Sequence, residues 1–509
     1  MKKSNVLQPP QKGRKIAVIQ PVRIVRGLSA TLFVLSICFA TGVAVAQQFG
    51  RDRGQGGFGG QGGAGGQESS LASLDPGPRT GFIATGDLTY PNNPGNPIKG
   101  LSTPQLAFFA NGLSQFNELE DVIRNGPGDG GLGPTFNSNS CGSCHSQPST
   151  GGTSPNIHAF PFTIGQNPQF TVGQVMGGSN SVPFFVTADG PVREARFKSD
   201  GGVHDLFTIA GRTDASGCTT EHLRQPDFAA EAASGNLSFR IPTPVFGAGL
   251  IENIADATIV MNLAASASRQ LGIFGVPNRS GNDGSITRFG WKAQNKSLII
   301  FAGEAYNVEM GITNELFPNE RGYPPNPIPP SCLFNPTPED RTVFESLDPT
   351  MTPSDVAAFA NFMRFLDQPL PACTGNGCSS QIQTGSMLFK AIGCANCHTP
   401  SLTTGSSGMA DSLSNVQANL FSDLALHHMG ANLADGITQG NAGPDQFRTA
   451  PLWGLGQRVF FLHDGRTSNL ARAILDHAGF GSESNRVVEN YEQLSTQNKQ
   501  NLILFLRSL

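Results

Sequence analysis

Apolar residues recur at helical spacing in four segments of the chain, which we expect to form helices. The first covers 103–116, where Thr103-Pro104 suits the start of a helix. The others begin at Thr352, run from Gly385 to Ile392, and run from Leu502 to Leu509. This periodicity predicts a mainly α protein.

A different pattern fills residues 150–255. Short apolar runs such as Phe184-Phe185-Val186 and Leu206-Phe207-Thr208 are broken repeatedly by Gly and Pro. Runs of this kind are typical of loops and short strands. We therefore expect this stretch to be an insertion of loops and short strands in a helical domain.

Residues 1–46 have the pattern of a secretory signal. Residues 1–27 carry Lys and Arg but no acidic residue, an apolar run follows from Leu28, and Ala44-Val45-Ala46 suits cleavage. The alternative is an uncleaved membrane anchor, because the apolar run is just long enough to span a bilayer. The Gly-rich linker 47–73 follows and has no means of burying a core. We expect an exported, periplasmic protein that contacts a membrane only if the signal stays uncleaved.

Composition narrows the choice of partners. The whole chain has 34 basic and 38 acidic residues, and loss of the cationic signal makes the mature protein more acidic. That balance argues against a nucleic-acid partner. The chain has 62 Gly, which favours loops, and its 35 Phe supply apolar lining, whereas Tyr and Trp number only 4 and 2.

Two C-x-x-C-H motifs carry the clearest chemistry. In such a motif the two thiols add across the vinyl groups of haem and the adjacent His becomes an axial iron ligand. Zinc sites place their cysteine pairs much closer together, and a thioredoxin-like redox site needs only one copy. The sequence therefore predicts two covalently bound c-type haems, attached at Cys141, Cys144, Cys394 and Cys397 and ligated by His145 and His398.

Four further cysteines lie outside these motifs and beyond the signal. An even number of cysteines in an exported protein favours disulfides. Cys373 and Cys378 are close enough in sequence to close a small loop, which leaves Cys218 to pair with Cys332. Free buried thiols are the alternative.

The two halves of the chain share an order of features, which indicates an internal duplication. Each has a helix, a C-x-x-C-H motif, a long stretch and an Arg-Pro-Gly segment, at 240–249 and 448–456. Trp291 precedes Leu298 by the same spacing as His463 precedes Leu470. Two haem modules, the first with an insertion, explain this order most simply.

Five segments around these features resemble those of a known family: 132–137, 288–293, 309–313, 448–454 and 463–466. Through them the chain is similar to the di-haem oxidoreductases of peroxidase type, often labelled thiol oxidoreductases. More distantly it resembles bacterial di-haem cytochrome c peroxidases and the enzyme that matures the methylamine dehydrogenase cofactor. The resemblance implies two cytochrome-c-like haem domains, which we expect at 74–331, with the insertion, and at 332–509.

The resemblance also implies roles for single residues. In the peroxidases an HDG segment precedes the distal ligand of the C-terminal haem at a spacing that corresponds here to His477. This departs from the Met or Tyr of the relatives, and Met429 is the rival ligand, whose thioether would raise the potential. Trp291 corresponds to a Trp between the two haems, an expected electron relay, with core packing as the other interpretation.

The peroxidatic carboxylate of the family corresponds to Glu309. A carboxylate over the N-terminal haem can take a proton from bound peroxide and return it to the leaving oxygen. Glu304 and Glu252 are competitors, because the spacing before Glu309 is slightly short. His158 is a candidate sixth ligand of the N-terminal haem. Four arginines could pair with haem propionates: Arg240, Arg288, Arg448 and Arg466.

These features together predict an exported di-haem c-type cytochrome oxidoreductase, an enzyme of peroxidase type. An electron-transfer haem would feed a catalytic N-terminal haem. A small redox protein would be the electron donor or acceptor, and peroxide or another small molecule the substrate. The alternatives are a non-catalytic electron-transfer cytochrome and an enzyme that oxidises an organic substrate with oxygen. A calcium ion between the domains would fit the resemblance, although no diagnostic acidic loop is seen.

Overall fold

The computed structural model describes residues 73–79, 95–124, 131–158, 163–172, 177–322, 327–342 and 354–509. These residues belong to one compact unit that runs from Ala64 to Leu509. The predicted signal and nearly all of the predicted linker lie outside them. Within the described ranges, no helix is both long and apolar enough to cross a bilayer.

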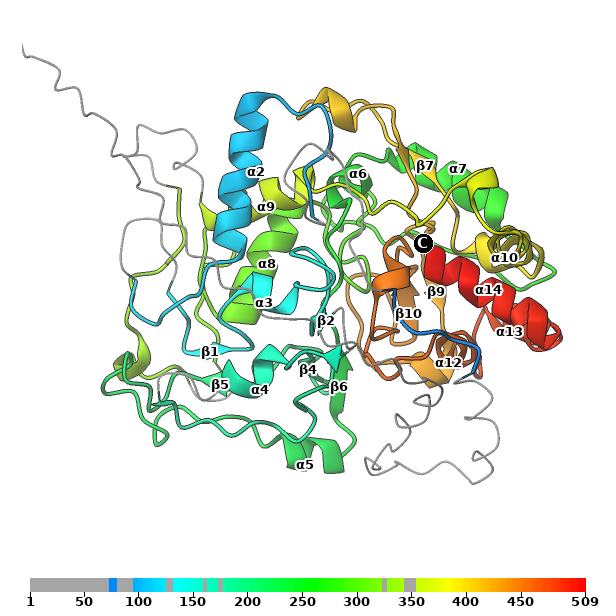
Figure 1. Ribbon diagram of the computed structural model, residues 1–509. Coiled ribbons are helices and arrows are strands. Elements are labelled where there is room, and N and C mark those ends of the chain that lie inside the picture. The colour runs from blue at the N-terminus through cyan, green and yellow to red at the C-terminus, as the bar shows by residue number, and fades with distance from the viewer. Residues whose placement is uncertain are drawn as a thin grey trace, which may run out of the picture. The chain divides into compact units, whose positions relative to one another are not determined.

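Three helices form the first helical group: α2 (Thr103–Phe116), α8 (Leu298–Met310) and α9 (Asp355–Phe365) (Figure 1). Helix α2 has exactly the predicted bounds, and Ser102 begins it in a capping box. Ser297 and Ser354 cap α8 and α9 through their side chains. The apolar faces of all three helices join the larger hydrophobic core.

The second helical group forms a separate, smaller core around the C-terminal haem motif. Helices α10 (Ser380–Ala391) and α14 (Thr496–Ser508) pack side by side, and α12 (Leu470–Asp476) and α13 (Asn485–Glu492) complete the group (Figure 1). Both α10 and α14 contain segments that the apolar periodicity predicts as helix, and each begins one or more turns before the predicted segment.

The two groups repeat the same helix crossing. Gly112 of α2 lies against the backbone of Ala358 and the side chain of Phe362, so closely that a Cβ there would be 2.2 Å from the Ala358 carbonyl oxygen. In the second group, a Cβ at Gly385 would be 2.1 Å from the backbone oxygen of Asn501. In both crossings the partner helix also presents a Phe one turn further on, and a glycine permits the close approach.

A second repeat precedes helices α8 and α12. An isolated antiparallel bridge joins Phe289 to Asn295 before α8, and another joins Phe461 to Thr467 before α12. The four bridge residues have the same offset in the numbering as the Trp291–His463 pair. The structure thus supports the duplication that the order of motifs predicts.

Short strands, loops and short helices fill most of the predicted insertion. Its sheets are two-stranded and antiparallel: β2 pairs with β3 and β4 with β6, whereas β5 pairs with β1, which precedes the insertion. The run at 184–186 forms a turn rather than a strand. Elements not yet placed are β1 (Thr135–Phe136), α3 (Cys141–Cys144), β2 (Ile157–His158), β3 (Thr163–Ile164), α4 (Pro168–Val172), β4 (Glu194–Phe197), β5 (Phe207–Thr208), α5 (Phe228–Ala233), β6 (Leu237–Arg240), α6 (Ala248–Glu252), α7 (Asp256–Ser266), β7 (Leu402–Thr403), β8 (Gln417–Ala418), β9 (Leu426–His428), α11 (Gly430–Leu433) and β10 (Gln446–Arg448), with short 3-10 turns at Pro330–Cys332, Gly375–Gly377, Cys394–Asn396, Asp411–Leu413 and Leu455–Gln457.

The expected fold class is met only in part. Helices are the main regular element, but the structure is 33% helical, so loops hold much of the chain. The packing also differs from the predicted division at residue 332. Helix α9 lies beyond that point in sequence yet packs on α2 and α8, because its apolar face completes the first core.

The segment 73–79 lies near the start of the chain but packs on the C-terminal helical group. Asp75 accepts two hydrogen bonds from the buried Arg507 guanidinium, each 2.8 Å, and one from the backbone N–H of Leu470. The backbone N–H of Arg79 donates to the carbonyl oxygen of Gly456. Residues assigned by sequence to the start of the N-terminal domain therefore brace the C-terminal core.

Both predicted disulfides are confirmed. Cys218 bonds to Cys332 in the first core, where both are buried, and Cys373 bonds to Cys378 across a short loop. The cysteines of the two C-x-x-C-H motifs are all free. The four motif thiols are therefore available for another partner.

Candidate functional site

The first C-x-x-C-H motif folds as the single turn α3, and His145 follows directly. The His145 Nδ1 lies 3.0 Å from the carbonyl oxygen of Gly152. A ring nitrogen that donates to a carbonyl leaves the other nitrogen free as a metal ligand. Burial lowers the pKa of His145 to about 4, so the imidazole is neutral at pH 7, the form that binds iron.

The second motif repeats this arrangement. The His398 Nδ1 lies 2.9 Å from the carbonyl oxygen of Phe421. Burial lowers the pKa of His398 to about 4 as well. In both modules a backbone carbonyl fixes the ring and leaves Nε2 for a ligand, as expected of proximal histidines.

A cavity opens beside each motif. The first, lined by Cys141, Cys144 and His145, holds about 1120 Å³ of empty space including its open mouth. The second, lined by Cys394, Cys397 and His398, holds about 1380 Å³ measured in the same way. Both are lined mainly by apolar side chains. Each is large enough for a cofactor.

Two arginines in the second cavity favour an acidic occupant. Arg448 is buried, Arg458 is partly buried, and burial lowers the pKa of each to about 10. Among the described residues, neither forms an ion pair with a carboxylate. A buried cation needs a compensating anion, which the propionates of haem would supply. The other three arginines suggested by sequence pair with Asp residues: Arg240 with Asp435, Arg288 with Asp256 and Arg466 with Asp464.

Trp291 lies between the two cavities and lines both of them. Its indole N–H donates to the carbonyl oxygen of Ile241 at 2.8 Å, which fixes the ring plane. The backbone N–H of Arg448 donates to the Trp291 carbonyl oxygen. The indole is therefore held where an electron relay between two haems would have to be.

The second cavity brings together His398, His477 and Met429. The His477 Nδ1 lies 2.6 Å from the carbonyl oxygen of Ala473, one turn earlier, which again leaves Nε2 free. Burial lowers the pKa of His477, so this ring too is neutral. Met429 instead packs with the small apolar cluster around Trp291. The geometry favours His477 over Met429 as the group opposite His398.

Two other histidines in this cavity have different surroundings. His427 is buried between Asp423 and Glu483, at 2.9 and 2.8 Å from its two ring nitrogens, so neither nitrogen is free for iron. His463 stacks on Phe447 with ring centroids 4.3 Å apart. His463 also meets the edge of Trp291, at 6.3 Å between centroids.

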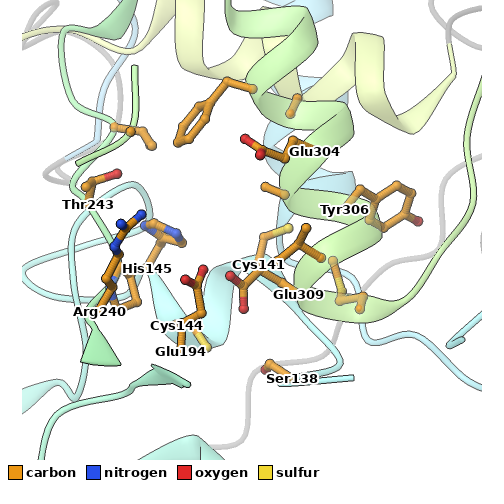
Figure 2. A pocket seen from close by; sticks show the side chains of 18 of the residues that line it. Ser138, Cys141, Cys144, His145, Glu194, Arg240, Thr243, Glu304, Tyr306 and Glu309 are labelled. Atoms are coloured by element: carbon orange, nitrogen blue, oxygen red, sulfur yellow. The ribbon is translucent and has the colours of Figure 1, made fainter. Parts of the chain in front are cut away.

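In the first cavity Glu309, near the end of α8, faces Glu194 of strand β4. Figure 2 shows the two carboxyl groups turned toward one another above Cys144, with His145 and Arg240 nearby. Burial and the charge of Glu194 raise the pKa of Glu309 well above its usual value. Burial opposes the ionisation of Glu194, but the charges of Arg196 and Arg240 outweigh burial and lower its pKa.

The competitors of Glu309 are engaged elsewhere. Glu304 lines the same cavity and accepts a hydrogen bond from the Asn295 side chain. Glu252 binds Arg364 at 2.8 Å and the backbone N–H of Leu298. His158 lies in strand β2, and its side chain is outside the described part of the structure.

Sequence reasoning missed Glu194, Arg196 and Arg458. Glu194 and Arg196 belong to a short strand in the insertion, where no local motif marks them as functional. Only the pairing of β4 with β6 brings them against α3 and α8. Within the described residues, no cluster of three or more His, Cys, Asp or Glu is arranged to hold a metal ion, and the expected calcium stays a prediction.

The comparison with models of protein families shows to which family the chain belongs. Residues 214–509, more than half of the chain, match the family described as "Di-haem oxidoreductase, putative peroxidase". The chain belongs to the di-haem oxidoreductase family. Membership implies two haems. The match begins after the first motif, so Cys141 and His145 rest on their own geometry.

Similarity to solved structures is weak. A MauG-like protein associated with microbial copper homeostasis is 17% identical, over 53% of this chain and 90% of that one, with a TM-score of 0.27. The diheme peroxidase BthA from Burkholderia thailandensis E264 is 13% identical, over 53% and 86%, with a TM-score of 0.26. TM-scores this low support no conclusion about fold or function. No curated protein matches the chain.

Proposed function

We propose that this di-haem oxidoreductase is a peroxidase-type enzyme with unequal haem sites. Its N-terminal site handles peroxide and its C-terminal site transfers electrons. The observation that carries the proposal is an asymmetry between the cavities. The first presents a partly buried pair of carboxyl groups, Glu194 and Glu309, whereas the second presents His477, a histidine with a free ring nitrogen, beside His398.

The described residues fit c-type haem in both cavities. Free thiols and a neutral imidazole with one free nitrogen stand together in each, and Arg448 and Arg458 offer charge to propionates in the second. When bound, haem supplies the iron centre at which peroxide or electrons are exchanged. Cys141 and Cys144 would hold it in the first cavity, with His145 as ligand. Cys394 and Cys397 would hold it in the second, with His398 and His477 as ligands.

The residues of the first cavity handle protons. Reduction of peroxide requires a proton to leave the oxygen that becomes bound and a proton to reach the oxygen that departs. Glu309 is positioned for both transfers, because its carboxyl group points into the cavity above the haem-binding motif.

Trp291 connects the two sites. Its ring borders both cavities, so electrons that arrive at the C-terminal site cross one fixed indole to reach the N-terminal site. The hydrogen bond from its indole N–H to the carbonyl oxygen of Ile241 fixes the orientation of the ring. His398 and His477 would hold the C-terminal haem from two ring nitrogens, which suits electron transfer rather than peroxide binding.

The cellular setting follows from the sequence pattern. The enzyme is exported to the periplasm, where thioether formation and the two disulfides are compatible with the redox environment. A small redox protein supplies its electrons, and the acidic mature chain binds no nucleic acid. Peroxide is the substrate.

The test is an electronic and electron paramagnetic resonance spectrum of the purified holoprotein, with and without peroxide. We expect one low-spin haem that does not respond to peroxide and one haem that is high-spin, or becomes so on reduction, and reacts. Two permanently low-spin haems that ignore peroxide would instead show a non-catalytic electron-transfer cytochrome. Reaction with oxygen and an organic substrate, but not with peroxide, would favour an oxygenase.

A further inference from the structure

Glu194 and Glu309 reach each other from different parts of the chain. Strand β4 carries Glu194 and helix α8 carries Glu309, and their side chains form a hydrogen bond in the first cavity. Figure 2 shows no other labelled side chain between the two carboxyl groups. An ionised carboxylate only accepts hydrogen bonds. A hydrogen bond between two carboxyl groups therefore requires that one of them carries a proton.

The neighbouring charges decide where that proton is. Arg196 forms a close ion pair with Glu194, and Arg240 adds its charge from strand β6. Arg240 also binds Asp435 at 2.6 Å, but Asp435 is shared with Lys292 at 3.1 Å, so the charge of Arg240 still acts on Glu194. Glu309 faces Glu194, and the buried Asp205 repels a charge on it further. Glu194 therefore stays ionised against Arg196, and Glu309 holds the proton.

This assignment creates a difficulty for Glu309 acting alone. A carboxyl group that already holds its proton cannot take another from peroxide. The cavity nevertheless has one proton vacancy, on Glu194, and the hydrogen bond between the two groups leads to it. Aspartic proteases show that two adjacent carboxyl groups can share one proton, because like charges in contact cannot both ionise.

We propose that Glu194 is the temporary proton acceptor behind Glu309 in this enzyme. Glu309 takes the proton of the incoming peroxide oxygen while it passes its own proton to Glu194, so the pair goes from one proton to two. The reverse transfer then delivers a proton from Glu309 to the departing oxygen, and the pair returns to one. No electrons move in these transfers. The inference rests on the proposed function, with Glu309 as the catalytic residue and Glu194 as a positioning residue that acts through it.

The pair makes a prediction that does not depend on turnover. The charge of Arg196 needs one negative partner, so the pair should hold one proton in the intact protein at pH 7. In Glu309→Gln, Glu194 remains as the anion and no acid is left. In Glu194→Gln, the unpaired Arg196 charge should draw the proton from Glu309, which then becomes the anion. Glutamine has the shape of a protonated glutamate, so both variants should load haem, and the haem absorbance verifies this.

The measurement is infrared difference spectroscopy of the holoprotein at pH 7, in which each variant is subtracted from wild type. Other buried carboxyl groups, such as Asp355, cancel in the subtraction. We expect both variants to lose the same deuterium-sensitive carboxylic acid band. Glu304→Gln, on the same helix and lining the same cavity, is the matched control and should keep the band.

The outcomes separate the inference from the proposed function. A band that persists in Glu194→Gln shows that Glu309 is protonated through burial alone, and it overturns the shared proton. Absence of the band from wild type overturns it as well. If the spectra behave as expected but the holoprotein ignores peroxide, the pair stands and the proposed function fails. In an active enzyme, Glu309→Gln should slow peroxide reduction about 100-fold or more.

Discussion

The crossing of α10 and α14 offers a sharp test of how the second haem module is held. Replacing Gly385 by Ala puts a methyl group 2.1 Å from the backbone oxygen of Asn501 and 2.7 Å from the Cβ of Phe505. Neither neighbour is the end of a flexible side chain. The helices must move apart by roughly 1 Å to reach an ordinary contact, and overpacking of this kind costs about 1–3 kcal/mol.

Part of that cost is offset. Alanine is the better helix former by about 1 kcal/mol, because glycine loses more backbone entropy on folding. We therefore expect Gly385→Ala to lower the free energy of unfolding by up to about 2 kcal/mol. The guanidinium midpoint of the haem-loaded protein, followed by circular dichroism, measures the change. Helix α10 leads directly to Cys394, so the same variant should also shift the spectrum of the C-terminal haem.

Two further variants make the comparison decisive. Gly408→Ala places its methyl group in open space, with no atom within 4 Å, and should leave the midpoint unchanged. Gly112→Ala, in the equivalent crossing of the first module, should destabilise by a similar amount, since its Cβ would lie 2.2 Å from the Ala358 oxygen. If Gly385→Ala is as stable as the Gly408 control, the close crossing does not constrain the module and the reasoning is wrong.

Three other predictions follow from the cavities. Trp291→Phe keeps an aromatic ring but removes the hydrogen bond to Ile241. It should slow electron transfer between the haems at least about tenfold, as measured by stopped-flow after reduced protein is mixed with peroxide. An unchanged rate would exclude the indole as the relay. His477→Ala should turn the C-terminal haem high-spin in its electronic spectrum, whereas Met429→Leu should not, and the opposite result would make Met429 the ligand. Burial lowers the pKa of His463 to about 4, so below about pH 6.5 the unfolded state binds a proton that the folded state does not. The free energy of unfolding should therefore fall by up to about 3 kcal/mol as the pH drops from about 6.5 to 4. Urea unfolding of His463→Phe should show a smaller fall with pH than the wild type, and parallel curves for the two proteins would contradict this origin.

Features that depend on neighbours in sequence were predictable. The bounds of α2 follow from apolar periodicity and a capping serine, and both disulfides follow from counting the cysteines that the haem motifs leave over. Trp291 and Glu309, identified by resemblance, line the expected cavity. A short stretch of chain fixes the local structure in most of these cases, whereas Cys218 and Cys332, 114 residues apart, were paired only as the two cysteines left over.

The rest depends on contacts that no short stretch encodes. Glu194 looks like any charged residue of a polar strand until β4 pairs with β6 and faces α8. The division at residue 332 does not follow the packing of α9, because periodicity predicts α9 as a helix without saying which core its apolar face will join. Asp75 likewise has no sequence signal for its buried contact with Arg507. Tertiary packing alone decides which of these side chains are buried and which residues they contact.

The two glycine crossings also bear on maturation. Each C-x-x-C-H motif is enclosed by a helix made much later in synthesis, α9 for the first and α14 for the second. Neither core can close until those helices have emerged, because long-range contacts form last. Both cysteine pairs should therefore remain accessible until α9 and α14 have been made. For the covalent haems proposed above, this order would leave time for attachment before each core closes.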